Sequence, residues 1–456
     1  MGPILLITTE PLPLPGRPAT GAGLRAWGLA VGLREAGFQV QLMTAAEGGG
    51  DEVTADRPDW VGGFARPDLP RLVREFDPEL VVLQHWGLAA LMGEPDRPLA
   101  IDLAGPHLLE RRLWGSPNPE ADLMEKLDAL RRADFVTTSG RWQRHYFLPY
   151  LAMAGWDVLD PEVAPVIPFS LEPAVAPAPP RPDRFFYGGF CLPWQDPSPG
   201  VEAVLEAMDR AGRGRLVFVG GAHPTLDVSR GRFEELLDRL QHHPRVELHP
   251  PLAHDPYRRL LAEGGVALDL MHPNAERELA FTTRTVGYLA AGLPVLHDNY
   301  SELGDLIARS GAGWAMDPVD PDTVRNLLLG ILEGRVDVTA PGRAAHALVR
   351  DHLHWHRTIG PLVTFCRDPQ PRTGRMAARL AFEERDRRLR QAETELARVR
   401  AELNTLRGKR WIRWGLGLIQ GSWMRWPAAL AATLVGLALV PVFVVNDLLA
   451  HPKRPQ

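Results

Sequence analysis

The sequence repeats one pattern twice, on either side of a proline-rich segment. In each copy, short apolar runs alternate with longer helical stretches, and glycines follow several of the runs. Parallel strands joined by covering helices produce this alternation. The sequence therefore predicts an α/β fold with two Rossmann-like domains that face a cleft, followed by a coiled coil and a membrane segment.

The first domain is predicted to span residues 1–173. It opens with a strand at 4–8, a glycine-rich loop and a helix that Gly37 closes. This succession of strand, glycine-rich loop and helix is the opening of a Rossmann-like unit. Further strands are expected at Val40–Met43, Leu80–Leu83, Leu99–Asp102 and Phe135–Thr138.

A linker and a second domain follow. Residues 174–182 are rich in proline and alanine, which favours a semi-rigid linker. The second domain is predicted over 183–340, with closing helices at 341–371. Its strands are expected at Phe185–Tyr187, Leu216–Val219, Val246–Leu248, Val266–Leu270 and Pro294–Leu296. Ligands of such sheets bind beyond the carboxyl ends of the strands, so the cleft between the domains is the predicted site.

Residues 377–407 carry a heptad pattern. The positions that form its seam are spaced alternately three and four residues apart: Phe382, Arg385, Leu389, Ala392, Leu396, Val399, Leu403 and Leu406. All but Arg385 are apolar, which is typical of a coiled coil and predicts a homo-oligomer. A single charged helix that lies on the body or on anionic lipid is the alternative.

Residues 409–450 are predicted to associate with a membrane. The run from Pro427 to Val445 holds 19 residues without a charge, close to the length that crosses a bilayer. The preceding segment interleaves basic residues with tryptophans, as membrane interfaces do: Lys409, Arg410, Trp411, Arg413, Trp414, Trp423, Arg425 and Trp426. A buried core helix is the alternative, and Pro441 leaves open whether the segment spans the bilayer or re-enters it.

The charge distribution separates the body from the tail. Residues 372–456 carry 16 basic and 7 acidic residues, whereas residues 1–371 carry 35 and 49. An acidic body disfavours a nucleic-acid partner. The chain has two cysteines, and Gly2–Thr8 is too short for the apolar region of a signal peptide. More basic residues precede the apolar run than follow it, so we expect the body at the cytoplasmic face of the membrane.

The glycine-rich turns favour phosphate binding, because backbone N–H groups at helix N-termini hold phosphate. A Walker A motif is absent, which disfavours a P-loop NTPase. Asp320 and Asp322 stand where a helix begins, and this favours capping over metal binding. The histidines show no metal-ligand spacing on one helix face, so no bound metal is predicted. None of the three lysines forms the Tyr-x-x-x-Lys pair of a nucleotide-sugar epimerase.

Several motifs, taken in order over residues 1–345, resemble the GT-B glycosyltransferases of the family-4 type. They include Gly21–Arg25, Asp77–Trp86, Asp102–Glu110, Ala133–Ser139, Gly188-Gly189, Trp194–Pro197 and Glu276–Pro294. The resemblance implies a bacterial enzyme at the inner membrane that moves a sugar from a nucleotide-sugar to a lipid-linked or polysaccharide acceptor in cell-surface glycan synthesis. It also implies retention at the anomeric carbon and no cofactor beyond the nucleotide-sugar co-substrate.

The resemblance assigns roles to individual residues. Donor binding falls to Gly21, Gly23, Gly189, Trp194, Asp196, Glu276, Thr283 and Arg284, acceptor binding to Asp102 and His107, and catalysis to His85, His107 and Arg284. Arg284 is expected to neutralise the diphosphate, because without a metal another cation must stabilise the leaving anion.

Two positions depart from the family pattern. Many family-4 enzymes carry a pair of glutamates where this chain has Leu279 and Gly287, and a lysine is missing after Gly188-Gly189. A glycine offers no side chain to the ribose. The rival hypothesis is therefore a non-catalytic, glycosyltransferase-like scaffold that acts through its coiled coil.

Overall fold

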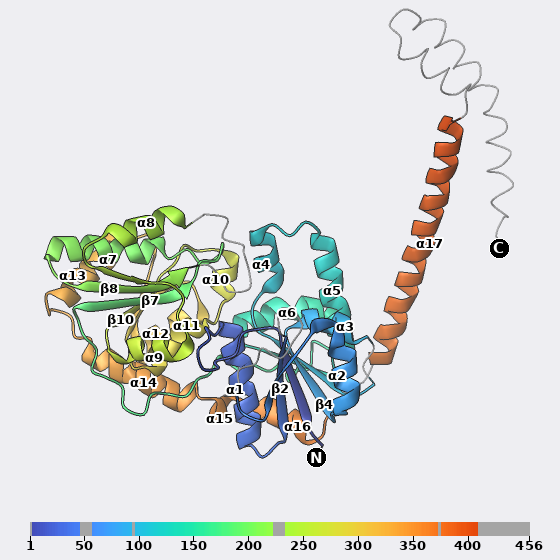
Figure 1. Ribbon diagram of the computed structural model, residues 1–456, viewed down its shortest axis with the longest axis horizontal. Helices are drawn as coiled ribbons and strands as arrows, with labels where there is room; N and C mark the ends of the chain where they lie inside the picture. Colours follow the sequence, from blue (N-terminus) through green and yellow to red (C-terminus); the bar gives the residue numbers. More distant parts are fainter. Residues whose placement is uncertain (1, 46–56, 94–95, 222–232, 373–374, 409–456) are drawn as a thin grey trace, which may run out of the picture. The chain divides into compact units, whose positions relative to one another are not determined.

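The computed structural model describes residues 2–45, 57–93, 96–221, 233–372 and 375–408. Residues 1–379 form one compact unit, and residues 380–456 form a second. The first unit holds two six-stranded parallel sheets, each with helices on both faces (Figure 1). The predicted α/β architecture of two Rossmann-like domains is confirmed.

The sheet of the first domain has the strand order β3-β2-β1-β4-β5-β6. Its central strand β1 (Ile4–Thr8) is buried throughout, as its continuous apolar sequence requires. The other elements are α1 (Gly21–Glu35), β2 (Val40–Ala45), β3 (Val61–Phe64), α2 (Leu69–Phe76), β4 (Leu80–Gln84), α3 (Ala89–Met92), β5 (Leu99–Leu103), α4 (His107–Trp114), α5 (Pro119–Arg132), β6 (Phe135–Thr138) and α6 (Arg141–Met153).

The sheet of the second domain has the order β12-β11-β10-β7-β8-β9, which is the same topology counted from β7. In each sheet the order reverses beside the first strand, and ligands of such sheets bind at that point. The elements are β7 (Arg184–Phe190), α7 (Ser198–Ala211), β8 (Arg215–Gly221), α8 (Glu234–His242), β9 (Val246–His249), α9 (His254–Ala262), β10 (Val266–Asp269), α10 (Ala275–Leu279), α11 (Thr283–Ala290), β11 (Val295–Asp298), α12 (Glu302–Ser310), β12 (Gly313–Met316), α13 (Pro321–Leu332) and α14 (Thr339–His352).

Two apolar cores enclose the second sheet. Helices α7, α8 and α13 pack on one face, while α9, α11, α12 and α14 pack on the other (Figure 1). The chain then returns to the first domain through α15 (Trp355–Thr358) and α16 (Gly360–Arg367). There Ile359, Leu362 and Cys366 join the core between β1 and α1. The segment predicted as closing helices therefore contributes to the cores of both domains.

The sequence signals at helix ends have the expected structural effect. Thr20 caps α1 by accepting a hydrogen bond from the N–H of Gly23 at 3.1 Å. Gly37 follows this helix with a φ of +91°, which a glycine adopts without strain. Asp320 caps α13 by accepting from the N–H of Thr323 at 3.1 Å, so the predicted capping role is confirmed.

Three features of the sheets differ from the sequence prediction. Strands β3 and β12 were not predicted, because Val61–Phe64 contains two glycines and Gly313–Met316 is short and half-buried. Gly188-Gly189 and Gly220-Gly221 continue their strands, since Gly188 pairs with Val219 and Gly189 with Gly220 in a parallel ladder. The predicted strands Phe185–Tyr187 and Leu216–Val219 therefore end too early.

Helix α17 spans Arg375–Gly408, and its residues 380–408 are the part of the second unit that the structure describes. Four seam residues of the predicted coiled coil, Leu389, Leu396, Val399 and Leu403, are 45–56% exposed. In the described part of the chain, no helix combines the length and apolarity that a membrane crossing needs. The predicted membrane segment at 409–450 lies outside the described residues.

A buried ion pair ties α1 to β5 and gives a prediction about stability. Arg25 donates to both carboxylate oxygens of Asp102 at 2.6 and 2.7 Å, and the two side chains are 3% and 2% exposed. Removing one partner of such a pair costs about 3–5 kcal/mol, whereas replacing both with apolar residues is often neutral. We expect Asp102→Ala to lower the free energy of unfolding of the full chain by this amount. The double variant Arg25→Met/Asp102→Leu, measured by the same denaturant titration, should lose less; an equal or larger loss would contradict this account.

Candidate active site

A cavity of about 640 Å³ lies between the two domains. Residues that follow β1, β5 and β6 line it from the first domain. The carboxyl-terminal ends of β7 and β8 and the first turn of α11 line it from the second. These are the ends of the strands at which ligands bind in open parallel sheets. The carboxyl-terminal ends of the strands of both sheets, where ligands are expected, therefore lie at one cavity.

The first turns of α1 and α11 meet across this cavity. A Cβ atom on Gly21 would lie 2.6 Å from the hydroxyl of Thr283, so only glycine allows this approach. Both residues line the cavity. Gly23 does not line it; a side chain there would overlap the carbonyl oxygen of Pro11. Of the two glycines predicted to bind the donor, Gly21 is placed at the cavity, and Gly23 packs the helix against the preceding loop.

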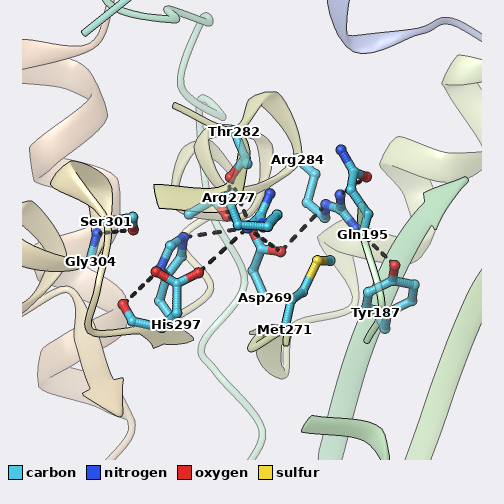
Figure 2. A network of polar contacts seen from close by, with 12 residues as sticks. Tyr187, Gln195, Asp269, Met271, Arg277, Thr282, Arg284, His297, Ser301 and Gly304 are labelled. Carbon is cyan, nitrogen blue, oxygen red and sulfur yellow. Dashed lines mark hydrogen bonds and ion pairs between the residues drawn. The ribbon is translucent and has the colours of Figure 1, made fainter. Parts of the chain in front are cut away.

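Arg284, on the first turn of α11, lines the cavity and is held in one position (Figure 2). It donates to the hydroxyl of Tyr187 at 2.8 Å and to the side-chain oxygen of Gln195. Its Nε lies 3.6 Å from the carboxylate of Asp269. A side chain at Gly189 would overlap the guanidinium, so this glycine makes room for the arginine.

Asp269, at the end of β10, is the centre of a buried polar network (Figure 2). It accepts hydrogen bonds from the hydroxyls of Thr282, at 2.8 Å, and Thr285. Burial alone would raise the pKa of Asp269, but Arg284 and Arg277 outweigh it and hold the pKa well below its usual range. Asp269 is therefore ionised and fixes the adjacent guanidinium groups.

The same network includes a second aspartate and a histidine. Arg277 lies 3.5 Å from both Asp269 and Asp298. The ring of His297 lies between the two carboxylates, 3.5 Å from Asp269 and 3.3 Å from Asp298. Burial would lower the pKa of His297, but Asp298 outweighs it and raises the pKa. His297 and Asp298 were not predicted as site residues, because each looked like an ordinary residue at a strand end.

Glu276 lines the cavity from α10 and is 4% exposed. Its Oε2 atom has no hydrogen-bond partner among the described residues. Burial raises the pKa of this carboxyl group to about 8. Because a buried polar atom without a partner is costly, this side chain is suited to meet a ligand.

The wall of the first domain carries His107, Glu110 and Glu10. The Nδ1 atom of His107 lies 2.6 Å from the carboxylate of Glu110. Glu10 accepts a hydrogen bond from the hydroxyl of Thr20 at 2.8 Å. Glu10 was not among the predicted site residues, although its place two residues after β1 was a usable signal.

Two residues predicted for acceptor binding or catalysis lie behind this wall. Asp102 does not line the cavity, since its oxygens are taken by Arg25 and by the hydroxyl of Thr137 at 2.7 Å. His85 does not line it either; its ring packs edge-on against His107, with centroids 3.9 Å apart. Burial, and then His107, lower the pKa of His85 well below its usual range. The structure thus places His107 at the cavity and gives Asp102 and His85 supporting positions.

Of Trp194 and Asp196, which are close in sequence and were both predicted to bind the donor, only one lines the cavity. Trp194 lines the cavity, whereas Asp196 accepts hydrogen bonds from the N–H and hydroxyl of Ser198, the first residue of α7, at 3.0 and 2.6 Å. Gly287 lines the cavity, and the nearest atom to a Cβ built there is 3.9 Å away, on Leu171. Within the described ranges, no group of three or more acidic, histidine or cysteine side chains is arranged to hold a metal ion.

No family model matches the chain. No curated protein matches its sequence. Solved structures do match, among them a sucrose-phosphate synthase from Thermosynechococcus elongatus, at 16% identity and a TM-score of 0.59 over 80% of this chain and 98% of that one.

Two further structures match at similar strength. HepE from Anabaena, solved with UDP-glucose, is 14% identical with a TM-score of 0.56, over 81% of this chain and 100% of its own. A trehalose-6-phosphate synthase is 10% identical with a TM-score of 0.58, over 81% and 100%. Each of these structures aligns with about four fifths of this chain. The chain has the GT-B fold.

Proposed function

We propose that the protein is a glycosyltransferase that moves a sugar from a nucleotide diphosphate to an acceptor. The observation that carries this proposal is the guanidinium of Arg284, which lines the cavity and lies beside the buried carboxylate of Asp269. Several structures that share the fold were solved with UDP or UDP-sugars, which supports a nucleotide-sugar as the donor. The cleft between the domains is the place for both substrates.

The reaction needs stabilisation of a leaving anion. The bond between the anomeric carbon and the diphosphate oxygen breaks, and the bond to an acceptor hydroxyl oxygen forms. The acceptor proton passes to the departing phosphate. Arg284 and the N-terminal end of α11 both present positive charge to the cavity, so negative charge that develops on the phosphate is stabilised there without a metal. We expect retention at the anomeric carbon, as the family resemblance implies.

Gly287, in place of an acidic residue, is the feature that motivates the rival scaffold hypothesis. The open space beside it shows that no other side chain has taken the position. The ribose would then bind through backbone groups or through neighbouring residues. The cavity and the positioned Arg284 favour the enzyme over the scaffold. A scaffold that acts through its coiled coil does not require a buried arginine at a cavity.

The C-terminal segment completes the proposal. We propose that residues 409–450 attach the enzyme to the cytoplasmic face of the bacterial inner membrane, where a lipid-linked or polysaccharide acceptor is confined. An anchor raises the effective concentration of such an acceptor. Flotation of the full chain with phospholipid vesicles tests this, with the chain truncated after Gly408 as the control; equal flotation of both would contradict it.

Helix α17 is proposed to pair with a second copy in parallel. Its exposed seam is flanked by charges that complement each other across a parallel, in-register pair. Arg388 would face Glu393 of the second copy, and Glu395 would face Arg400. Pairs at these flanking positions set partner choice and orientation in coiled coils.

Cysteine cross-linking tests this orientation. Ala392→Cys places a thiol in the seam, where a parallel, in-register dimer brings it next to its own copy. The two native cysteines are buried, so they will not compete. We expect a cross-linked dimer under mild oxidation, and none for Arg390→Cys on an outer face. Cross-linking of both variants to the same extent, or of neither, would contradict the parallel dimer.

Donor binding tests the catalytic proposal. Calorimetric titration of the full chain in detergent with UDP-, GDP-, ADP- and dTDP-sugars, without added metal, should show micromolar binding of one nucleotide. Arg284→Ala should weaken it about 30-fold or more, the effect of removing one partner of a buried charge pair. The control Arg210→Ala, at an exposed position on α7, should bind as the wild type does. A folded protein that binds none of these donors would favour the scaffold.

A further inference from the structure

Helix α6 begins without a cap of its own. Its N-cap residue is Gly140, which has no side chain to accept a hydrogen bond from the first turn. The first N–H groups of a helix have no partner within the helix, and a side chain at the N-cap usually satisfies one of them. A cap for α6 therefore has to come from outside the helix and its N-cap residue.

Glu302 of the second domain supplies this cap. It is the first residue of α12, and its carboxylate accepts a hydrogen bond from the N–H of Trp142 at 3.1 Å. The other carboxylate oxygen accepts from the Nε of Arg141, also at 3.1 Å. A Cβ atom on Gly140 would lie 2.8 Å from the capping oxygen, so the glycine leaves room for a carboxylate from the other domain. Negative charge at a helix N-terminus is stabilising, and Glu302 is only 16% exposed.

The capped turn of α6 supports the first-domain wall of the cavity. Gln143, next to Trp142, is buried and lines the cavity. Its side-chain oxygen accepts hydrogen bonds from the N–H of Gly105 at 3.2 Å and from the hydroxyl of Ser139 at 2.6 Å. Gly105 has a φ of +92° and stands two residues before His107, the first residue of α4. The loop that carries His107 to the cavity is therefore fastened to the residue beside the capped one.

In the second domain, Glu302 follows directly on the network that holds Arg284. Ser301 caps α12 by accepting from the N–H of Gly304 at 3.1 Å, and Figure 2 shows both residues beside the network. A side chain on Gly304 would overlap the carbonyl oxygen of Asp298, so α12 starts against the backbone of that aspartate. Asp298 is itself a member of the network. The buried groups that orient the donor-site arginine therefore also fix the start of the helix that carries Glu302.

We propose that Glu302 is a positioning residue that links the donor site to His107. Its carboxylate caps α6 only while the two domains are closed on each other, and the capped turn fixes Gln143 and the loop of His107. A donor held between the domains binds the closed arrangement more tightly than an open one and so favours it. Opening the domains removes the cap, and the loop of His107 loses its support. This inference rests on the proposed function and names the residue that carries donor binding across the domain boundary.

Hydrogen exchange of the full chain in detergent, followed by mass spectrometry, tests the cap first without nucleotide. Peptides over 140–147 report on the capped turn, and peptides over 104–110 report on the loop of His107. We expect Glu302→Ala to speed exchange over 140–147 roughly fivefold, the effect of a lost N-cap, and to speed it over 104–110 as well. Asp305→Ala, exposed on the same helix, should exchange as the wild type does. Equal exchange in the wild type and Glu302→Ala would contradict the proposal.

The nucleotide selected by titration supplies the second arm of the experiment. In the wild type it should slow exchange over 140–147 roughly fivefold, although Arg284 lies in the other domain. In Glu302→Ala it should still slow exchange over 283–290, at the start of α11, but no longer over 140–147. A cap that only stabilised the fold would not respond to the nucleotide.

Gly140→Ser separates the cap from the contact between the domains. Serine is a favoured N-cap residue, and its Cβ atom would take the space of the Glu302 carboxylate. We expect exchange over 140–147 to stay as slow as in the wild type without nucleotide, and to become insensitive to the nucleotide. If the nucleotide slows exchange there to the wild-type extent in both Gly140→Ser and Glu302→Ala, the proposal is overturned.

These outcomes differ from a failure of the proposed function. An absence of slowing over 283–290 with every nucleotide is a failure of the proposed function, and the nucleotide-free comparison still decides whether Glu302 caps α6. Slowing over 283–290 in the wild type without any slowing over 140–147 leaves the donor site standing and overturns the role of Glu302.

Discussion

Burial of the Asp269 carboxylate beside two arginines is the interaction on which the site depends. A buried charge is tolerated only when a partner neutralises it and hydrogen bonds saturate it. Asp269 meets both conditions, since Thr282 and Thr285 donate to it while Arg277 and Arg284 balance its charge. The desolvation cost of these buried charges is met when the protein folds. Arg284 is therefore already oriented toward the cavity before a ligand binds.

Other features of the second domain follow from this constraint. Gly189 must lack a side chain because the guanidinium occupies that space. Tyr187, on the same strand, accepts a hydrogen bond from the arginine at 2.8 Å. The domains also close against each other, since Glu302 accepts from the N–H of Trp142 and the Nε of Arg141, both at 3.1 Å. These hydrogen bonds join α6 of the first domain to α12 of the second.

The fold was largely predictable, because buried parallel strands have continuous apolar sequences that can be recognised directly. Strands β1 and β6 begin and end where the sequence predicted, whereas β3 and β12 escaped because glycine and short length hide the pattern. The same weakness of local patterns explains the glycines at 188 and 189, which look like a turn but pair as a strand. Local sequence does not show which neighbouring strand a glycine faces.

The site was predictable only in part, for a physical reason. His107, Glu276 and Arg284 follow strand ends or begin helices, so topology alone carries them to the cavity. Asp102 also stands near a strand end, but it is buried in an ion pair with Arg25 of α1. A pairing between such distant segments cannot be recognised from the local sequence. Asp269 was missed because its partners, 8 to 16 residues further along the chain, meet it only once α10 and α11 fold back onto the end of β10.

The most direct test of the central claim is an experimental structure of the full chain with UDP, or with the nucleotide that titration selects. The account predicts the β-phosphate within hydrogen-bond distance of the Arg284 guanidinium and at the N-terminus of α11, with the Asp269 contact kept. A nucleotide bound elsewhere, or an Arg284 side chain turned away from the phosphates, would contradict it.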